Sequence, residues 1–227
     1  IIKGAGKKAT FEVWTYNSNH VSADEVEETE RALGVRVHVM RQPRWMAWMF
    51  KLRLAVLRVL LRYPYLRYLR LGDKALASII EYAPDMVWIY GEETACFSRL
   101  FPDKPCVVTM PDCESLHYHR LLSKDFATLS LPQVMRYAVA FWQYRGMERD
   151  MRRYKATFHF VGRQDAAFFC EVCPEAKVVF LPHPLYAHRD KAIRFHKPMI
   201  RLLFAGRYDF YCQHGSDRLL EAMMTAD

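Results

Sequence analysis

Acidic side chains follow two predicted buried strands at the point where each strand ends. The apolar run at 84–91 (PDMVWIYG) is followed by Glu92 and Glu93, and the run CVVTM is followed by Asp112 and His117. Ligands of open parallel sheets bind at the carboxyl ends of the strands. Paired carboxylates at such a position can orient the hydroxyl groups of a sugar or act as a general base. The plain alternative for Glu92 and Glu93 is capping of the following helix through its dipole.

A second candidate site lies in a strand–turn–helix pattern at 200–222. A short apolar run predicts a buried strand, Gly206 and Arg207 follow it, and Gly215 precedes Ser216, a favourable N-cap for a helix. Backbone N–H groups at a helix N-terminus and a guanidinium group both bind phosphate. Gly206, Arg207 and Gly215 are therefore candidate phosphate-binding residues. A turn with no ligand is the alternative.

The cysteines and histidines do not predict a metal site. Cys170 and Cys173 have the spacing of a ligand pair, but no second pair accompanies them. His117 and His119 lie two residues apart on a predicted helix after Asp112, so they face in different directions. We therefore expect neither a metal nor another cofactor.

The positive charge of the chain is concentrated in residues 40–72. This segment holds seven arginines, one lysine and no acid, which equals the net charge of +8 for the whole chain. Four of its cations follow one another at spacings of seven, seven and four, which predicts one stripe along a helix. Tryptophans lie beside that stripe. The residues expected to face a membrane are Arg44, Trp45, Trp48, Lys51, Arg58 and Arg62.

A basic amphipathic helix with interfacial tryptophans suits an anionic membrane surface, where each cation contributes roughly 1 kcal/mol. The alternative is a helix packed on the core whose long cationic side chains extend to solvent. No nucleic-acid-binding motif accompanies the charge, so nucleic acid is not an expected partner.

The composition is that of a folded protein. The 227 residues are 52% apolar and 14% aromatic, which supplies a core and excludes disorder as the dominant state. The six cysteines are scattered, and we find neither a signal peptide nor an apolar run long enough to span a bilayer. We therefore expect reduced thiols and a cytoplasmic location, with peripheral attachment to the inner face of the membrane as a further possibility.

Alternating strands and helices must position these residues. They predict an α/β fold, a Rossmann-like parallel sheet with helices on both faces. Arg163 follows the predicted strand FHFVG, and His183 follows KVVFLP. Because the carboxyl ends of parallel strands meet at one edge, we expect Arg163 and His183 to line the same cleft as the acidic residues.

The order of these segments resembles that of GT-B fold glycosyltransferases, specifically the family 4-like group. The similarity covers roughly residues 35–222 and rests on the succession PDMVWIYG, CVVTMPD, a helical stretch, ATFHFVGRQDAAF, KVVFLPHPLY, a basic linker and LLFAGR. In that family a strand ending in Gly-Arg opens the nucleotide-sugar domain.

The resemblance implies a Rossmann-like acceptor-side domain at 1–185, an interdomain linker at 186–198 and the start of a nucleotide-sugar-binding domain at 199–227. It also implies that the first strand of the family's fold and the rest of its second domain lie outside these 227 residues, which alone are expected to be inactive.

The resemblance also implies a function. A sugar would pass from a nucleotide-sugar donor to a glycan or lipid-linked acceptor, with retained configuration and without a metal, and Gly206 and Arg207 would bind the donor diphosphate. The sequence departs from the family's pattern at three places. Pro111 replaces the histidine that commonly precedes Asp112, Pro182-His183-Pro184 replaces Pro-Asn-Gly, and no lysine follows Arg207 in the loop that keeps Gly215.

Two other functions remain open at this point. The chain could be a Rossmann-like module without catalytic activity that binds a membrane surface or a partner. It could also belong to a sugar-nucleotide epimerase of the GT-B type, which needs carboxylates and a histidine converging from both domains.

Overall fold

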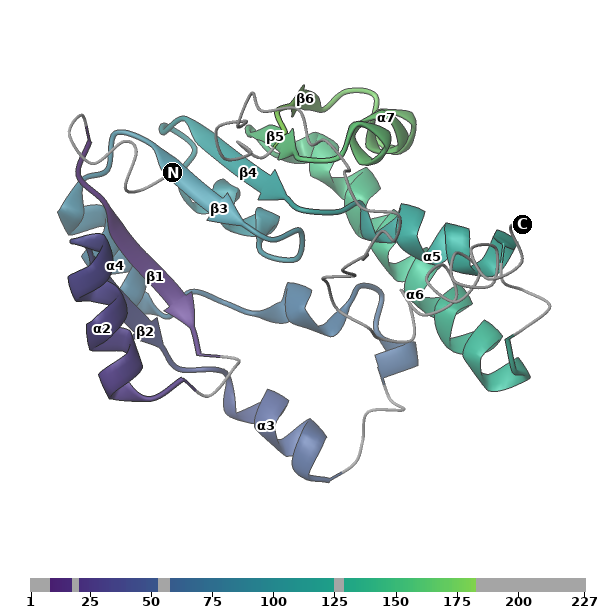
Figure 1. Ribbon diagram of the computed structural model, residues 1–227, viewed down its shortest axis with the longest axis horizontal. Coiled ribbons are helices and arrows are strands. Elements are labelled where there is room, and N and C mark those ends of the chain that lie inside the picture. Colours follow the sequence, from purple (N-terminus) through teal and green to yellow (C-terminus); the bar gives the residue numbers. More distant parts are fainter. Residues whose placement is uncertain (1–8, 18–20, 53–57, 125–128, 183–227) are drawn as a thin grey trace, which may run out of the picture. The chain divides into compact units, whose positions relative to one another are not determined.

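The computed structural model describes residues 9–17, 21–52, 58–124 and 129–182. The chain divides into two units, Ile1–Pro184 and Leu185–Asp227, and every described residue belongs to the first. The order of elements is α/β throughout (Figure 1): β1 (Glu12–Tyr16), α2 (Ala23–Leu33), β2 (Arg36–Met40), α3 (Arg44–Lys51), η2 (Tyr65–Tyr68), α4 (Asp73–Tyr82), β3 (Val87–Tyr90), η3 (Ala95–Leu100), β4 (Cys106–Met110), α5 (Glu114–Lys124), α6 (Leu131–Asp150), η5 (Met151–Arg153), β5 (Thr157–Phe160), α7 (Arg163–Val172) and β6 (Lys177–Phe180).

Local sequence signals set the ends of the first helix. Ser22 forms a capping box with Glu25, in which the Ser22 side chain accepts from the Glu25 N–H and the Glu25 carboxylate accepts from the Ser22 N–H. Gly34 ends the helix with a φ of 67°, a left-handed conformation that favours glycine. Both ends of α2 are therefore set by residues of its own local sequence.

Two parallel sheets are present among the described residues. β1 and β2 form a two-stranded sheet, and β3, β4, β5 and β6 form a four-stranded sheet in that order. Side chains connect β1 to the elements that precede β3: Trp14 packs edge-on against Tyr82 of α4, and the Tyr16 hydroxyl donates to the carbonyl of Arg70. The predicted Rossmann-like parallel α/β fold is confirmed.

The core lies on one face of the four-stranded sheet. Alternate residues of the strands point to this face because the side-chain period of a strand is two. Helices α6 and α7 and the short helix η3 supply the other side of the core. Its buried members are Ile89, Ala95, Val108, Met110, Cys113, Leu116, Met147, Met151, Tyr154, Phe158, Phe160, Ala166, Phe169 and Cys173.

The opposite face of the sheet carries a directed chain of hydrogen bonds. His159 Nε2 lies 2.9 Å from the carbonyl oxygen of Leu181, which can only accept, so Nε2 carries the proton. Nδ1 then accepts from the hydroxyl of Thr109 at 3.0 Å, and Thr109 Oγ1 accepts from Trp88 Nε1 at 2.7 Å. Three strands and the end of β6 are tied together in this way.

The basic segment is not one continuous helix. Helix α3 ends at Lys51, and residues 61–63 form a bend. The prediction that Arg44, Lys51, Arg58 and Arg62 share one helical stripe is therefore wrong. One reason is Pro64, which disfavours helical backbone at the residue before it. Another is the Gln143 amide of α6, which donates to the carbonyls of Arg58 and Leu61 at 2.8 and 2.7 Å.

Truncation of Phe158 tests the position of the core. This side chain is fully buried on β5 against Phe169, whereas Phe180 on the neighbouring strand β6 is 37% exposed. We expect Phe158→Ala to lower the free energy of unfolding by about 3–5 kcal/mol, because it leaves a cavity in the core. Phe180→Ala is the matched control and should cost clearly less. Urea unfolding measures both, and equal losses would contradict the placement of the core.

Candidate functional site

Five carboxyl groups gather at the carboxyl ends of β3 and β4. We call Glu92, Glu93, Asp112, Glu114 and Glu148 the acidic cluster. The first two follow β3, the next two follow β4, and Glu148 comes from α6. Their proximity is electrostatic as well as spatial, because neighbouring members of the cluster raise the pKa of Glu92 and that of Glu114, as described below.

A glycine turn directs the acidic pair after β3. Gly91 has a φ of 102°, in the region that favours glycine, and its N–H donates to the carbonyl of Thr109 on β4. The Thr94 hydroxyl closes the turn by donating to the carbonyl of Tyr90 at 2.9 Å. The turn therefore keeps Glu92 and Glu93 beside the end of β4.

Glu148 is the centre of the cluster. Its side chain is fully buried and accepts from the Ser115 N–H at 3.0 Å, from the Cys113 thiol at 3.3 Å and from the Ser115 hydroxyl. A buried carboxylate is costly unless such donors surround it. The three hydrogen bonds fix α6 against the turn that leads from β4 into α5.

Glu92 lies beneath the surface of the same turn. Its Oε2 accepts from the N–H of Glu114 at 3.3 Å, and its Oε1 is buried without a hydrogen-bond partner among the described residues. Burial raises the pKa of Glu92 well above its ordinary value, and the nearby Glu148, Glu93 and Glu114 carboxyls raise it further. These effects favour the neutral form of the Glu92 carboxyl.

Tyr144 of α6 supports Glu93. Its hydroxyl donates to Glu93 Oε1 at 2.8 Å, and its ring stacks on Tyr118 of α5 at a centroid distance of 5.7 Å. Burial, together with the Glu93, Glu114 and Glu92 carboxyls, raises the pKa of the Tyr144 phenol. The phenol consequently stays protonated and orients the Glu93 carboxylate.

Glu114 is the member of the cluster that titrates near neutral pH. Burial and the charges of Glu93, Asp112 and Glu148 raise the pKa of Glu114 to about 7. Across the described ranges, the ion pairs join Glu12 to His38 and Asp150 to Arg62, so no cation is paired with the cluster. A carboxyl with this pKa can both accept and donate a proton at physiological pH.

His117 lies one turn into α5. Burial lowers its pKa, the charge of Asp112 opposes that effect, and Arg120 lowers the pKa further. Asp112 itself is exposed at the end of the β4 turn. A neutral imidazole therefore lies within electrostatic reach of an exposed carboxylate.

Asp165 of α7 connects the segment that follows β5 to the edge of the sheet that carries the acidic cluster. Its Oδ1 accepts from the N–H of Cys113 at 3.1 Å, which ties the turn after β5 to the turn after β4. The Asp165 carboxylate lies directly against Gly162, where a Cβ atom would collide with it. A glycine is required there for this contact.

The structure brings together part of the predicted site. Glu92, Glu93 and Asp112 meet in the acidic cluster, and His117 lies beside Asp112. Arg163 does not join them: it is exposed, and its guanidinium lies 5.2 Å from the centre of the Phe180 ring. The remaining predicted site residues lie outside the described part of the chain: His183, Gly206, Arg207 and Gly215.

Among the predicted membrane residues, Arg44, Trp45 and Trp48 are exposed on α3, and the side chain of Lys51 is not described. Arg58 lies over the ring of Tyr65 at 4.1 Å, and Arg62 forms an ion pair with Asp150.

Sequence reasoning missed Glu148 and Tyr144 and did not single out Glu114. A signal for Glu148 is present in the sequence. It stands four residues after Tyr144 and three before Met151, so it falls on the buried stripe of α6. An acid within an apolar stripe indicates a buried polar network, but nothing in the local sequence identifies its partner.

Two searches of the described residues gave negative results. No group of three or more His, Cys, Asp or Glu side chains in the described ranges is arranged to hold a metal ion. Among the helices of the same residues, none combines the length and the apolar character needed to cross a membrane.

Comparisons of the chain with protein-family models, curated proteins and solved structures gave no match.

The pH dependence of stability tests the acidic cluster. The pKa of Glu114 is raised from 4.5 to about 7 in the folded protein, so its contribution to stability is complete below pH 4.5 and is lost as pH rises through 7. The variant Glu114→Gln has no carboxyl at this position to ionise, so it does not lose stability in this way as pH rises. We expect its unfolding free energy, relative to the original protein, to improve by about 2 kcal/mol between pH 5 and pH 8.

Glu28→Gln, at an exposed acid of α2, is the control and should leave the pH profile unchanged. Urea unfolding at the two pH values gives the comparison. Parallel profiles for the original protein and Glu114→Gln would show that the carboxyl is not perturbed.

Proposed function

We propose that this chain is the acceptor-side part of a GT-B type glycosyltransferase, which transfers a sugar from a nucleotide-sugar donor to a glycan or lipid-linked acceptor. One observation carries the proposal: Glu93 and Glu114 lie at the carboxyl ends of neighbouring parallel strands, partly exposed, over the buried Glu92 and Glu148. Sugar hydroxyls are donors that match such carboxylates, and this edge of a parallel sheet is where ligands bind.

In the proposed reaction Glu114 accepts a proton from the acceptor. The hydroxyl oxygen of the acceptor forms a bond to the anomeric carbon of the donor sugar, and the bond from that carbon to the diphosphate oxygen breaks. The hydroxyl proton passes to Glu114, whose pKa of about 7 suits this exchange at neutral pH. Glu93, oriented by the Tyr144 hydroxyl, accepts a hydrogen bond from a second hydroxyl of the acceptor.

The donor side of the proposal rests on the sequence. Gly206 and Arg207 would hold the diphosphate, with Gly215 in the same loop, and the guanidinium of Arg207 would stabilise the charge of the leaving group. The order of segments that resembles the GT-B glycosyltransferases supports this assignment.

Nucleotide-sugar turnover tests the proposed transfer. Full-length protein would be assayed with UDP-, GDP- and ADP-sugars and glycan acceptors, beside Glu114→Gln and Arg207→Ala. Loss of a general base typically costs 10²–10⁴-fold, so we expect Glu114→Gln to lower kcat/KM by about that factor and to abolish the rise of the rate through pH 7.

Arg207→Ala should weaken donor binding. The control Glu171→Gln, at an exposed acid of α7, should change neither donor binding nor kcat/KM. If no donor is bound or turned over, or if Glu114→Gln keeps the full rate and its pH dependence, the proposal fails.

A membrane surface is part of the same proposal. Helix α3 exposes Trp48, of which 62% is accessible, and Leu60, in the short helical turn at 58–60, is 78% accessible. Exposed tryptophan and leucine beside arginines are typical of segments that lie in the interface of an anionic bilayer. We propose that this surface attaches the protein to the cytoplasmic leaflet, where a lipid-linked acceptor would be met.

Vesicle flotation tests the attachment. We expect the protein to float with phosphatidylglycerol vesicles at low salt, and Trp48→Ser to reduce the bound fraction several-fold because an interfacial anchor is lost. Ile80→Ser is the control, since Ile80 is as exposed as Trp48, at 62%, and lies on α4, outside the basic segment. Equal loss in both variants would contradict a specific role for α3.

A further inference from the structure

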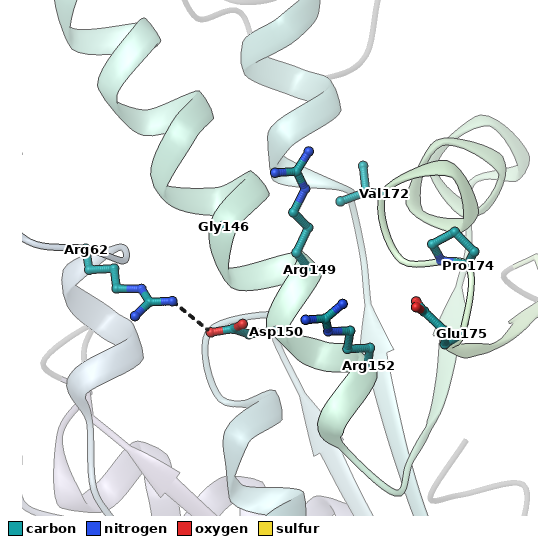
Figure 2. A pocket seen from close by; sticks show the side chains of 8 residues that line it. All are labelled: Arg62, Gly146, Arg149, Asp150, Arg152, Val172, Pro174 and Glu175. Carbon is teal, nitrogen blue, oxygen red and sulfur yellow. Dashed lines mark ion pairs between the residues drawn. The ribbon is translucent and has the colours of Figure 1, made fainter.

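A cavity of about 500 Å³ lies at the end of helix α6, and no residue of the acidic cluster lines it (Figure 2). Three segments far apart in the sequence form its walls: the turn at Arg62, the last turn of α6 with η5, and the connection from α7 to β6. We call it the arginine pocket. Its lining residues are Arg62, Gly146, Arg149, Asp150, Arg152, Val172, Pro174 and Glu175.

One acid of the pocket is already compensated. Asp150 accepts a hydrogen bond from the Tyr63 hydroxyl and forms an ion pair with Arg62, whose Nη2 lies 3.6 Å from Oδ2 (Figure 2). These contacts join the turn at 62–63 to α6. Because Asp150 is engaged by this pair of partners, it does not neutralise the other two arginines.

Arg149 and Arg152 provide the unbalanced charge. They are three residues apart, so they lie on the same side of the helix end. Both are exposed, and in the described part of the chain neither forms an ion pair. Glu175 stands across the pocket, and Val172 and Pro174 form an apolar wall beside it (Figure 2). Three arginines and two acids leave the lining with a net charge of +1.

We propose that the arginine pocket binds the phosphate or diphosphate group of a ligand. Guanidinium groups match phosphate oxygens with paired hydrogen bonds, and two of them can hold a dianion between them. The net positive charge of the lining favours a doubly charged group over a monoanion, and Glu175 reduces this preference. The apolar wall of Val172 and Pro174 suits an uncharged part of the same ligand.

The alternative role of these arginines is structural. Cations in the last turn of a helix interact favourably with its C-terminal carbonyls, and this needs no ligand. That role predicts no saturable binding of phosphate compounds. The two interpretations therefore differ in whether saturable binding depends on Arg149 and Arg152. Arg207→Ala, the variant of the proposed donor site, would be titrated in parallel, so that binding at that site is distinguished from binding in the arginine pocket.

Calorimetric titration with inorganic pyrophosphate tests the pocket. We expect saturable binding by the full chain, weakened about tenfold or more in the double variant Arg149→Gln/Arg152→Gln, since each charge-assisted contact is lost. The matched control is Arg136→Gln/Arg153→Gln. It also removes two exposed arginines from α6 and η5, but neither residue lines the pocket, so its affinity should change less than about twofold.

Unfolding curves of both double variants would first establish that they fold. Absence of binding by the original protein, or equal weakening in the two double variants, would overturn the proposal.

Two further kinds of ligand distinguish a soluble phosphate compound from a lipid headgroup. Soluble UDP and ADP would be titrated in parallel, and flotation would compare phosphatidylcholine vesicles with and without phosphatidic acid. A loss in Arg149→Gln/Arg152→Gln confined to the soluble ligands assigns the pocket to a free phosphate compound. A loss confined to phosphatidic acid vesicles assigns it to a lipid headgroup.

Discussion

The buried carboxyl of Glu148 is the interaction on which the edge of the sheet depends. It accepts three hydrogen bonds from Cys113, in the turn between β4 and α5, and from Ser115, in the first turn of α5. Removing such an acceptor would leave a buried backbone N–H without a partner, which costs about 1–3 kcal/mol. Helix α6 therefore holds in place the segment that carries Asp112 and Glu114.

Like charges, and not ion pairs, set the chemistry of this edge. No described cation is paired with the cluster, and burial together with the neighbouring carboxyls raises the pKa of Glu92 well above its ordinary value and that of Glu114 to about 7. The same repulsion lowers stability at high pH, because the unfolded chain ionises these groups freely. Active sites commonly hold titratable groups in arrangements that lower the stability of the folded protein.

The arginines of the basic segment serve more than one purpose. Arg58 lies over the Tyr65 ring, and Arg67 donates to the Tyr154 hydroxyl at 3.0 Å, so both fasten the segment to itself or to the core. Arg62 pairs with Asp150 and borders the arginine pocket. The exposed apolar and cationic surface is left to α3 and its surroundings. A run of like charges in the sequence has thus been divided between structural contacts and a free surface.

The sequence by itself determined most strands and the ends of some helices. Short apolar runs located the strands, the capping residues Ser22 and Gly34 set the ends of α2, and the acids Glu92 and Asp112 were assigned to strand ends, because these signals act over a few residues. Only the tertiary structure decided which groups meet. The burial of Glu148, the pKa of Glu114 and the hydrogen bonds from Gln143 to the basic segment all involve residues 20 or more positions away. Local periodicity carries no information about such partners, since packing and dielectric environment arise only when distant segments come together.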